Sequence, residues 1–290
     1  MKERIDRWRA RWPAFDVVVA VAQKGGRDGV GRMSAVLSYY SFFSIFPLLL
    51  VFTSVLGSMM HGSWKTKLQE SALANFPVIG EQISKQATHP LQGRNIATIL
   101  GAVTALWAGS RAFDSFEQAM HIVWHGALQR QPGLLKRRLR AFMLLGVLGV
   151  GLIATTVLGG WAAAAPIGGL GRPLGFLVTI AANMTLLLVM YQVSIPDHQD
   201  WRRLLPGAVL GGVGLTILHA VGGWYIARVV AGASDTYGTF AVVLGLLTWV
   251  NLTGKLTIWP AELNAVLNER AELAAAIALP PADVLSVDGS

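Results

Sequence analysis

The sequence predicts an all-α, polytopic membrane protein with six transmembrane helices and an N-terminal amphipathic surface helix. Two observations support this prediction. Hydrophobic residues make up 53% of the 290 residues and charged residues only 14%, whereas a soluble domain has about 25% charged residues. The chain also contains long charge-free stretches, and about 20 mostly apolar residues are enough for a helix to cross the bilayer core. This composition excludes an ordinary soluble enzyme, a disordered chain and a fibrous repeat.

Six stretches are long and apolar enough to be transmembrane helices. They cover residues 33–60, 95–113, 141–171, 173–196, 204–227 and 236–254. We therefore expect an N-terminal cytoplasmic segment (1–32), a six-helix transmembrane domain (33–270) and a cytoplasmic tail (271–290) whose end is disordered.

The positions of the Lys and Arg residues predict the orientation of these helices. If the N-terminus is cytoplasmic, 18 of the 24 Lys and Arg residues fall on the cytoplasmic side and 6 on the other side. Cytoplasmic loops of membrane proteins carry such an excess of positive charge. Both termini are therefore predicted to be cytoplasmic, and the net charge of +8 does not call for a nucleic-acid partner.

The first 32 residues are predicted to lie on the inner surface of the membrane. Large apolar residues recur there at helical spacing, with arginines on the other face and an interruption near Pro13: Ile5, Trp8, Trp12, Phe15 and Val19. Acidic residues mixed into the basic region argue against a cleavable signal peptide. They also make an RNA-binding arm the weaker alternative.

The first predicted transmembrane helix contains an aromatic and proline-bearing element. Tyr39 and Tyr40 lie about 9–10 Å from its cytoplasmic start, and Pro47 falls about halfway along it. Proline removes one helical hydrogen bond, so a kink is expected there. The kink could line a substrate path, although close helix packing explains the same residues.

The end of the second predicted helix is the most polar position near the bilayer. Arg111, Asp114 and Glu117 follow one another within two turns, and Arg111 lies about 22 Å along a helix counted from residue 96. Ionisable groups at such depths usually face the bundle interior or water. The simpler explanation is a helix that emerges into the cytosol. His121 and His125 have ligand-compatible spacing, but no third ligand is evident, so no metal site is predicted.

The sixth predicted helix carries a second polar stripe that includes Asn251, Lys255 and Glu262. Lys255 could extend to the inner interface, and Glu262 lies two turns further along, too far for a direct bond to Lys255. Solvation of these groups is again the simpler explanation.

The polar residues of the first, second and sixth helices share one level of the membrane. Tyr39 and Tyr40 lie level with Arg111, Asp114, Asn251 and Lys255, in the third of the bilayer nearest the cytoplasm. We therefore hypothesise a polar cavity between these helices that opens to the cytoplasm or to the inner leaflet.

No catalytic residues or cofactor are predicted. The chain lacks G-x-S-x-G and H-E-x-x-H motifs and has no cysteine. Asp197, His198 and Asp200 share one short loop, so their side chains cannot readily converge on one ion. The sequence therefore indicates a protein that is not an enzyme.

Four stretches of this sequence resemble the YihY/BrkB family of bacterial inner-membrane proteins, also called the virulence factor BrkB family. They are LSYYSFFSIFPLLLVFTSVLG (37–57), LWAGSRAFDSFEQAMHIVW (106–124), LPGAVLGG (205–212) and residues 237–267, which end in Ala-Glu262-Leu-Asn264-Ala. The resemblance implies six helices with cytoplasmic termini in the bacterial plasma (inner) membrane. The family formerly carried a ribonuclease BN label, and members have been linked to envelope integrity, virulence and lipid transport. Lys255 stands where the family pattern leads us to expect a neutral residue.

These observations together predict a transporter-like protein that takes an amphiphilic or anionic lipid-like substrate from the cytoplasmic leaflet. Arg111 and Lys255 would hold the headgroup, Asp114 and Glu117 would orient Arg111, and Pro47 would supply the bend. The alternative is a non-transporting envelope scaffold, and a membrane-bound ribonuclease is the third and disfavoured option. Membrane lipids are the expected partners, and homo-oligomerisation stays open.

Overall fold

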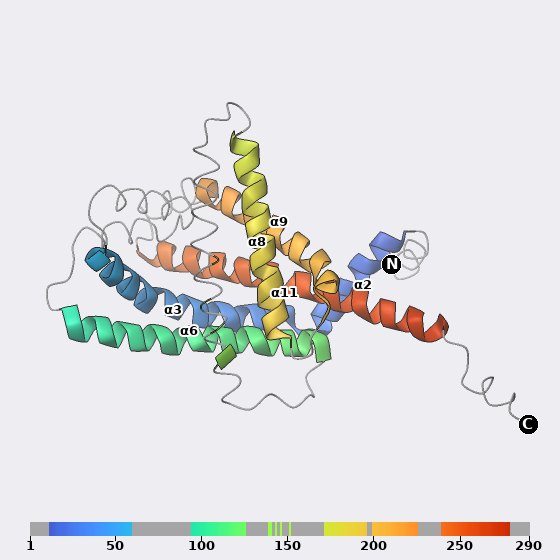
Figure 1. The fold of residues 1–290 in the computed structure, drawn as a ribbon, viewed down its shortest axis with the longest axis horizontal. Helices are drawn as coiled ribbons and strands as arrows, with labels where there is room; N and C mark the ends of the chain where they lie inside the picture. Colours follow the sequence, from blue (N-terminus) through green and yellow to red (C-terminus); the bar gives the residue numbers. More distant parts are fainter. Residues whose placement is uncertain are drawn as a thin grey trace, which may run out of the picture.

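The described part of this computed structural model is built from helices alone. It comprises residues 12–59, 94–125, 139–140, 143, 146, 151, 171–195, 199–225 and 239–278. No strand occurs in these ranges, which is the all-α architecture expected from the sequence (Figure 1). The helices are α2 (Pro13–Asp28), α3 (Val30–Met59), α6 (Arg94–His125), α8 (Gly171–Ser194), α9 (Trp201–Tyr225) and α11 (Thr239–Ala278).

Five of the six predicted transmembrane stretches coincide with these helices. The first, second, fourth, fifth and sixth stretches fall on α3, α6, α8, α9 and α11. The third stretch, 141–171, lies outside the described residues except for Met143, Gly146, Gly151 and Gly171. Among the described residues, Pro173–Ser194 and Trp201–Gly222 are long and apolar enough to cross a membrane.

Two of the helices continue well beyond the predicted stretches. α6 extends to His125, beyond the stretch 95–113, and α11 extends to Ala278, beyond the stretch 236–254. At 1.5 Å per residue, the 40 residues of α11 make a helix about 60 Å long, about twice the thickness of the hydrocarbon core. α11 is therefore longer than a single crossing of the hydrocarbon core requires.

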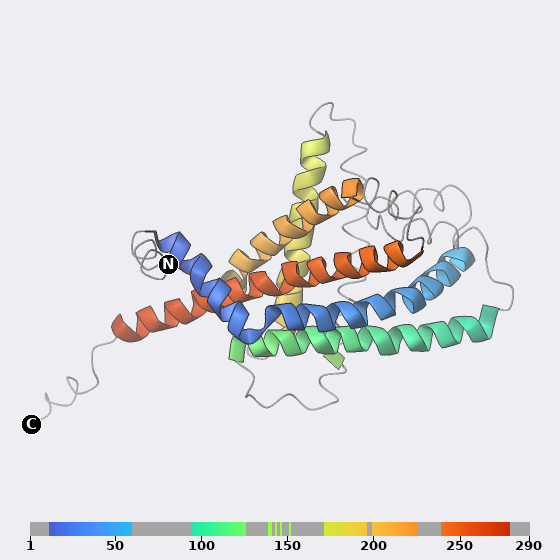
Figure 2. The ribbon, with the colours of Figure 1, turned by 180° about the vertical axis from the view of Figure 1, so that it is seen from behind.

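The N-terminal segment is a separate helix that bends away from α3 at Gly29. Pro13 stands at the start of α2, directly after the extended Trp12, where a proline costs no hydrogen bond; residues 1–11 of the predicted surface segment lie outside the described residues. Gly29 has φ +75, a left-handed conformation that closes helices and favours glycine. Its N–H donates to the Gly25 carbonyl at 3.1 Å, and α3 starts at the next residue (Figure 2).

The helix α11 is the central element of the bundle, since it contacts α2, α3, α6 and α9. α3 and α6 run side by side in opposite directions, and α8 packs on α9 (Figures 1 and 2). The core lies where α3 begins, α6 and α8 end and α9 begins. Its largest fully buried apolar side chains are Tyr191, Phe116, Met120, Leu187, Leu204 and Ile258.

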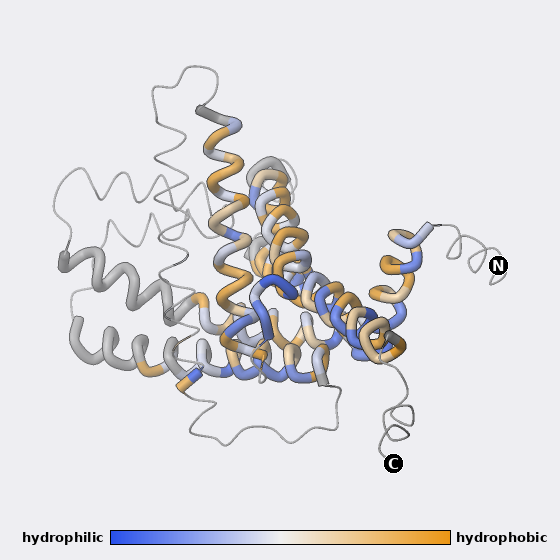
Figure 3. The backbone as a smooth tube through the Cα atoms, turned by 45° about the vertical axis from the view of Figure 1, so that its right-hand side comes forward, coloured by the Kyte–Doolittle hydropathy of each residue, from blue (hydrophilic) through white to orange (hydrophobic). Residues whose placement is uncertain are grey.

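The outer surface of the described helices is strongly apolar. Val103, Leu177 and Phe240 are each about three-fifths exposed, and hydrophobic residues run along most of α8 (Figure 3). Soluble monomers rarely expose large contiguous apolar patches, whereas lipid tails readily cover them. This surface, the composition and the all-helical architecture together identify an all-α membrane protein.

Candidate functional site

The densest group of buried charge lies where α2, α6 and α11 meet. Lys24 Nζ donates to Glu262 Oε2 at 2.9 Å, to Asp28 Oδ2 at 2.7 Å and to the Val123 carbonyl oxygen at 2.6 Å. Lys24 is 7% exposed and Glu262 is fully buried. An ammonium group has three donors, and all three are used here. We call these four groups the Lys24 cluster.

Local sequence explains how the Lys24 cluster forms. Lys24 and Asp28 are four residues apart and thus neighbours on one face of α2. The Val123 carbonyl lies in the last described turn of α6, which ends at His125, at the negative end of the helix dipole. A lysine ammonium is well suited to this position.

A second ion pair holds α2 against α11. Arg270 Nη2 lies 2.6 Å from Asp16 Oδ2. Asp16 and Lys24 are eight residues apart on α2, and their partners Arg270 and Glu262 are eight residues apart on α11. The earlier residue on α2 pairs with the later residue on α11, so the two helices run antiparallel. Glycine at position 25 permits the contact, since a Cβ there would lie 2.5 Å from the Trp259 ring.

The charges of the Lys24 cluster do not balance if both carboxyl groups are ionised. One ammonium group then faces two carboxylates. Burial raises the pKa of Glu262 to about 7; the hydrogen bond and charge of Lys24 lower it only in part, and the charge of Asp28 raises it further. Burial alone would lower the pKa of Lys24, but hydrogen bonds and charges of Asp28 and Glu262 together raise it. Lys24 is therefore charged, and Glu262 is the group that gains or loses a proton near neutral pH.

This arrangement predicts a pH dependence of stability. Because the pKa of Glu262 is raised from 4.5 to about 7, the folded protein binds more protons than the unfolded chain between these values. The stability that Glu262 contributes is then fully present below about pH 4.5 and is lost as the pH rises through about 7. Thermal unfolding from about pH 4 to pH 8 should show this loss in the native protein but not in Glu262→Gln. Parallel curves for the two proteins would contradict the assignment.

The motif residue Asn264 forms a second buried polar contact, between α11 and α9. Asn264 Oδ1 accepts from the Gly207 N–H at 2.7 Å, and Asn264 Nδ2 donates to the Leu204 carbonyl at 3.0 Å. The two bonds lie on either side of Pro206. Proline has no N–H group, so it cannot donate the usual helical hydrogen bond within α9. Glu262 and Asn264 of the Ala-Glu-Leu-Asn motif therefore connect α11 to different neighbours.

The structure places the predicted site residues at several separate positions. Glu262 lies in the Lys24 cluster, and Glu117 pairs with Arg140 at 3.2 Å. Asn251 Nδ2 donates to Ser38 Oγ at 3.2 Å, between α11 and α3, and Lys255 is half-buried one turn further along α11. Tyr39 is exposed and its ring packs against Tyr40 and Phe43. Pro47 lies within α3, but its side chain is outside the described residues.

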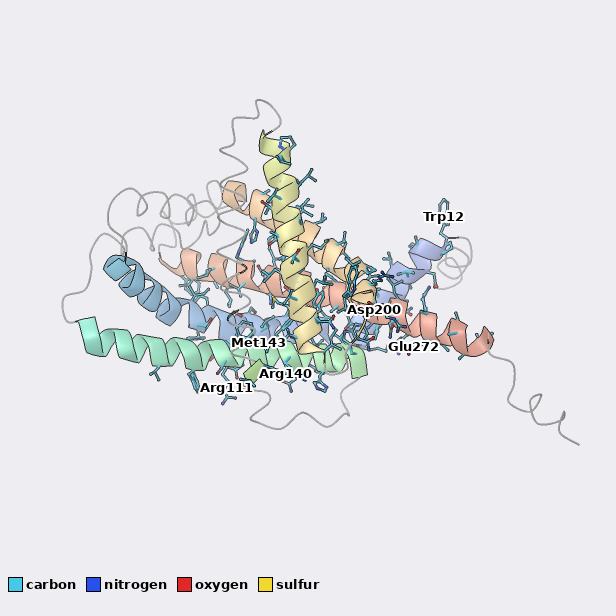
Figure 4. The ribbon with its side chains drawn as sticks, in the orientation of Figure 1. Trp12, Arg111, Arg140, Met143, Asp200 and Glu272 are labelled. Carbon is cyan, nitrogen blue, oxygen red and sulfur yellow. The ribbon has the colours of Figure 1, made fainter. Side chains whose placement is uncertain are left out.

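Arg111 lies on the outer face of α6 and not in the helix interface. Its guanidinium sits over the exposed Trp107 ring, 5.9 Å from the ring centre, and Figure 4 shows it projecting from the edge of α6. Asp114 is half-buried nearby. The predicted residues whose side chains are described thus lie at several positions on α3, α6 and α11, and the cavity between the first, second and sixth helices stays a prediction.

One part of this arrangement was missed from the sequence. Lys24 was counted only as one of the N-terminal basic residues, although Glu262 proves to be its partner 238 residues along the chain. The available signal was the i,i+4 spacing of Lys24 and Asp28 within an apolar helix face.

In the described helices, no group of three or more His, Asp or Glu side chains could hold a metal ion.

Comparison with known proteins places the chain in a family. The family described as "Virulence factor BrkB" matches residues 21–283. The chain belongs to the BrkB family. This match includes the Lys24 cluster and all six described helices except the first eight residues of α2, and it confirms the resemblance seen in the sequence.

Relatives within the BrkB family are similar along most of the chain. The ribonuclease-like protein YfkH of Bacillus subtilis is 25% identical over 83% of this chain and 90% of its own length. The inner membrane protein YhjD of Escherichia coli is 23% identical over 79% of this chain and 74% of its own. A UPF0761 membrane protein of Chromohalobacter salexigens is 25% identical over 84% of this chain, which spans 60% of that relative. No solved structure matches the chain. The chain is thus an integral membrane protein of the BrkB family.

Proposed function

We propose that this chain crosses the bacterial inner membrane six times, with both termini in the cytoplasm, and binds an anionic amphiphile of the inner leaflet at Arg111. The Lys and Arg distribution supports this orientation. The start of α3 and the end of α6 lie at the same end of the bundle, beside the Lys24 cluster (Figure 1). Helices that alternate in direction across a membrane would have this arrangement.

The position of Arg111 is the observation that carries the binding proposal. Arg111 is exposed on the outer face of α6, and its guanidinium lies over the exposed Trp107 ring. It lies 12 residues before Val123, or about 18 Å from the Lys24 cluster toward the opposite membrane face. An exposed guanidinium at that depth is costly unless it meets an anionic group.

The surroundings of Arg111 suit an amphiphile. Towards the outer leaflet the same face of α6 carries Trp107 and Val103, which are apolar and exposed. Towards the cytoplasm it carries Ser115 and Gln118, which can form hydrogen bonds. A lipid phosphate can accept two parallel hydrogen bonds from a guanidinium, while the acyl chains would lie along the apolar part. In a transporter-like protein, the bound lipid would then move across the membrane.

Lipids that co-purify with the protein test this proposal. Mass spectrometry should find about tenfold less anionic lipid with Arg111→Ala than with the native protein, which corresponds to the loss of about 1.4 kcal/mol. Arg202→Ala is the matched control, because Arg202 also lies over an exposed tryptophan, Trp201, at 5.5 Å, but at the start of α9. An unchanged lipid profile in Arg111→Ala would overturn the proposal.

A non-transporting scaffold is the second candidate, and the packing of α3 against α11 favours it. Ser38 and Asn251 are hydrogen-bonded there, and a Cβ at Gly254 would lie 3.5 Å from the Ser34 carbonyl oxygen. Side chains and backbone thus fill this part of the region where the cavity was predicted. The scaffold would retain its protein partners in Arg111→Ala, and its lipid content would not depend on Arg111.

A further inference from the structure

The helix α2 has an unusual orientation relative to the protein. Its charged residues Lys24 and Asp28 face α11 and α6. Its most exposed large apolar residues face away, since Phe15 is 38% and Val18 63% exposed, and Trp12 directly before the helix is 60% exposed. An amphipathic helix that packs on a protein in water normally has the reverse arrangement.

The exposed apolar residues form one continuous face of α2. At about 100° per residue, Trp12, Phe15, Val18 and Ala22 fall within a sector of about 120°. The C-terminal end of α2 lies at the Lys24 cluster. In Figure 4, Trp12 projects from the N-terminal end of α2, away from the other helices. We call these four residues the outer face of α2.

We propose that the outer face of α2 is buried among the headgroups and upper acyl chains of an anionic inner leaflet, while its opposite face stays fixed to α11 and α6. This inference does not depend on the Arg111 site. It makes α2 a lipid-contacting part of the folded bundle and not a loosely attached surface segment.

The connection to α3 keeps α2 near the membrane. Only Gly29 separates the two helices, and α3 is an apolar helix that begins its membrane-crossing stretch within a few residues. The 16 residues of α2 span about 24 Å, and the two ion pairs with α11 stop the helix from swinging away. An apolar helix face held this close to a bilayer gains free energy by entering it.

Charge identifies the chemistry of the leaflet. Residues 1–32 contain eight Lys and Arg residues and four Asp and Glu residues. Of these four acidic residues, Asp16 and Asp28 are already paired with Arg270 and Lys24, whereas Arg27 and Arg32 are exposed. Basic residues beside an amphipathic helix favour anionic headgroups.

Spin labels can measure the depth of the outer face in the full-length protein. The chain contains no cysteine, so Val18→Cys and Gln23→Cys each carry one label. Both positions are exposed, and they lie about 140° apart around the helix. The measurement compares collisions with dissolved oxygen, which concentrates in lipid, and with a water-soluble nickel chelate.

In vesicles of phosphatidylglycerol and phosphatidylethanolamine, the label at position 18 should collide several-fold more with oxygen than with the chelate. The label at position 23 should show the opposite preference. In vesicles of phosphatidylcholine alone, the preference at position 18 should weaken. Equal access of the chelate to both labels would overturn the proposal, as would dipolar broadening at position 18, which would place a second copy of the chain on this face. An oxygen preference that is the same in both kinds of vesicle would overturn the role of anionic lipid.

Discussion

Replacing Lys24 by alanine is expected to lower the free energy of unfolding by about 3–5 kcal/mol, the range found when one member of a buried ion pair is removed. The substitution leaves the buried Glu262 carboxyl without its cation and the Val123 carbonyl without its donor. The loss should be largest at about pH 8, above the pKa of Glu262, because the carboxyl group can take up a proton at lower pH. Chemical unfolding of the purified protein in detergent measures both effects.

Two further variants separate this effect from a general effect of changing α2. Arg27→Ala removes an exposed positive charge from the same helix and should change stability by less than about 0.5 kcal/mol. The double variant Lys24→Met, Glu262→Leu should recover most of the loss, because apolar pairs of similar volume often replace buried ion pairs without cost. A Lys24→Ala protein as stable as Arg27→Ala would show that the Lys24 cluster does not hold α2.

Replacing Gly207 by alanine is the second substitution with a large expected effect. The new Cβ would collide with the Pro260 carbonyl oxygen and with the Asn264 side chain. The Pro260 carbonyl is backbone and cannot rotate away, so α9 and α11 must separate. We expect a loss of about 1–3 kcal/mol or more and a lower thermal unfolding temperature.

Gly26→Ala is the matched control for this prediction. No heavy atom lies within 4 Å of a Cβ at Gly26, and alanine favours helix formation over glycine by about 0.5–1 kcal/mol. This variant should therefore be as stable as the native protein or slightly more stable. Equal stability of Gly207→Ala and the native protein would contradict the close contact of α9 with α11.

The sequence predicted the existence and order of the five described helices from α3 to α11 well, because lipid imposes a minimum apolar length. It predicted their ends less well at α6 and α11. The predicted stretches were bounded by the absence of charged residues, so they end near the first ionisable residues. Glu117 and Glu262, however, are buried within helices that continue past them. Lys24 pairs with Glu262 and Arg140 with Glu117, and hydropathy carries no information about such partners.

The contacts of the candidate site could not be predicted for a related physical reason. Glu262 and Asn264 were recognised as part of a motif, but periodicity does not show that one faces α2 and the other faces α9. For α2, the amphipathic pattern was visible, but not which face contacts the protein. The inward orientation of Lys24 depends on α11 and α6, which follow far along the chain.

The binding of anionic lipid at Arg111 is the central claim of this account, and native mass spectrometry of the intact protein tests it most directly. Phosphatidylglycerol and phosphatidylcholine would be added in equal amounts to the native protein, to Arg111→Ala and to Arg202→Ala. The native protein and Arg202→Ala should retain phosphatidylglycerol in preference, and Arg111→Ala should lose this preference. An undiminished preference in Arg111→Ala would contradict the account.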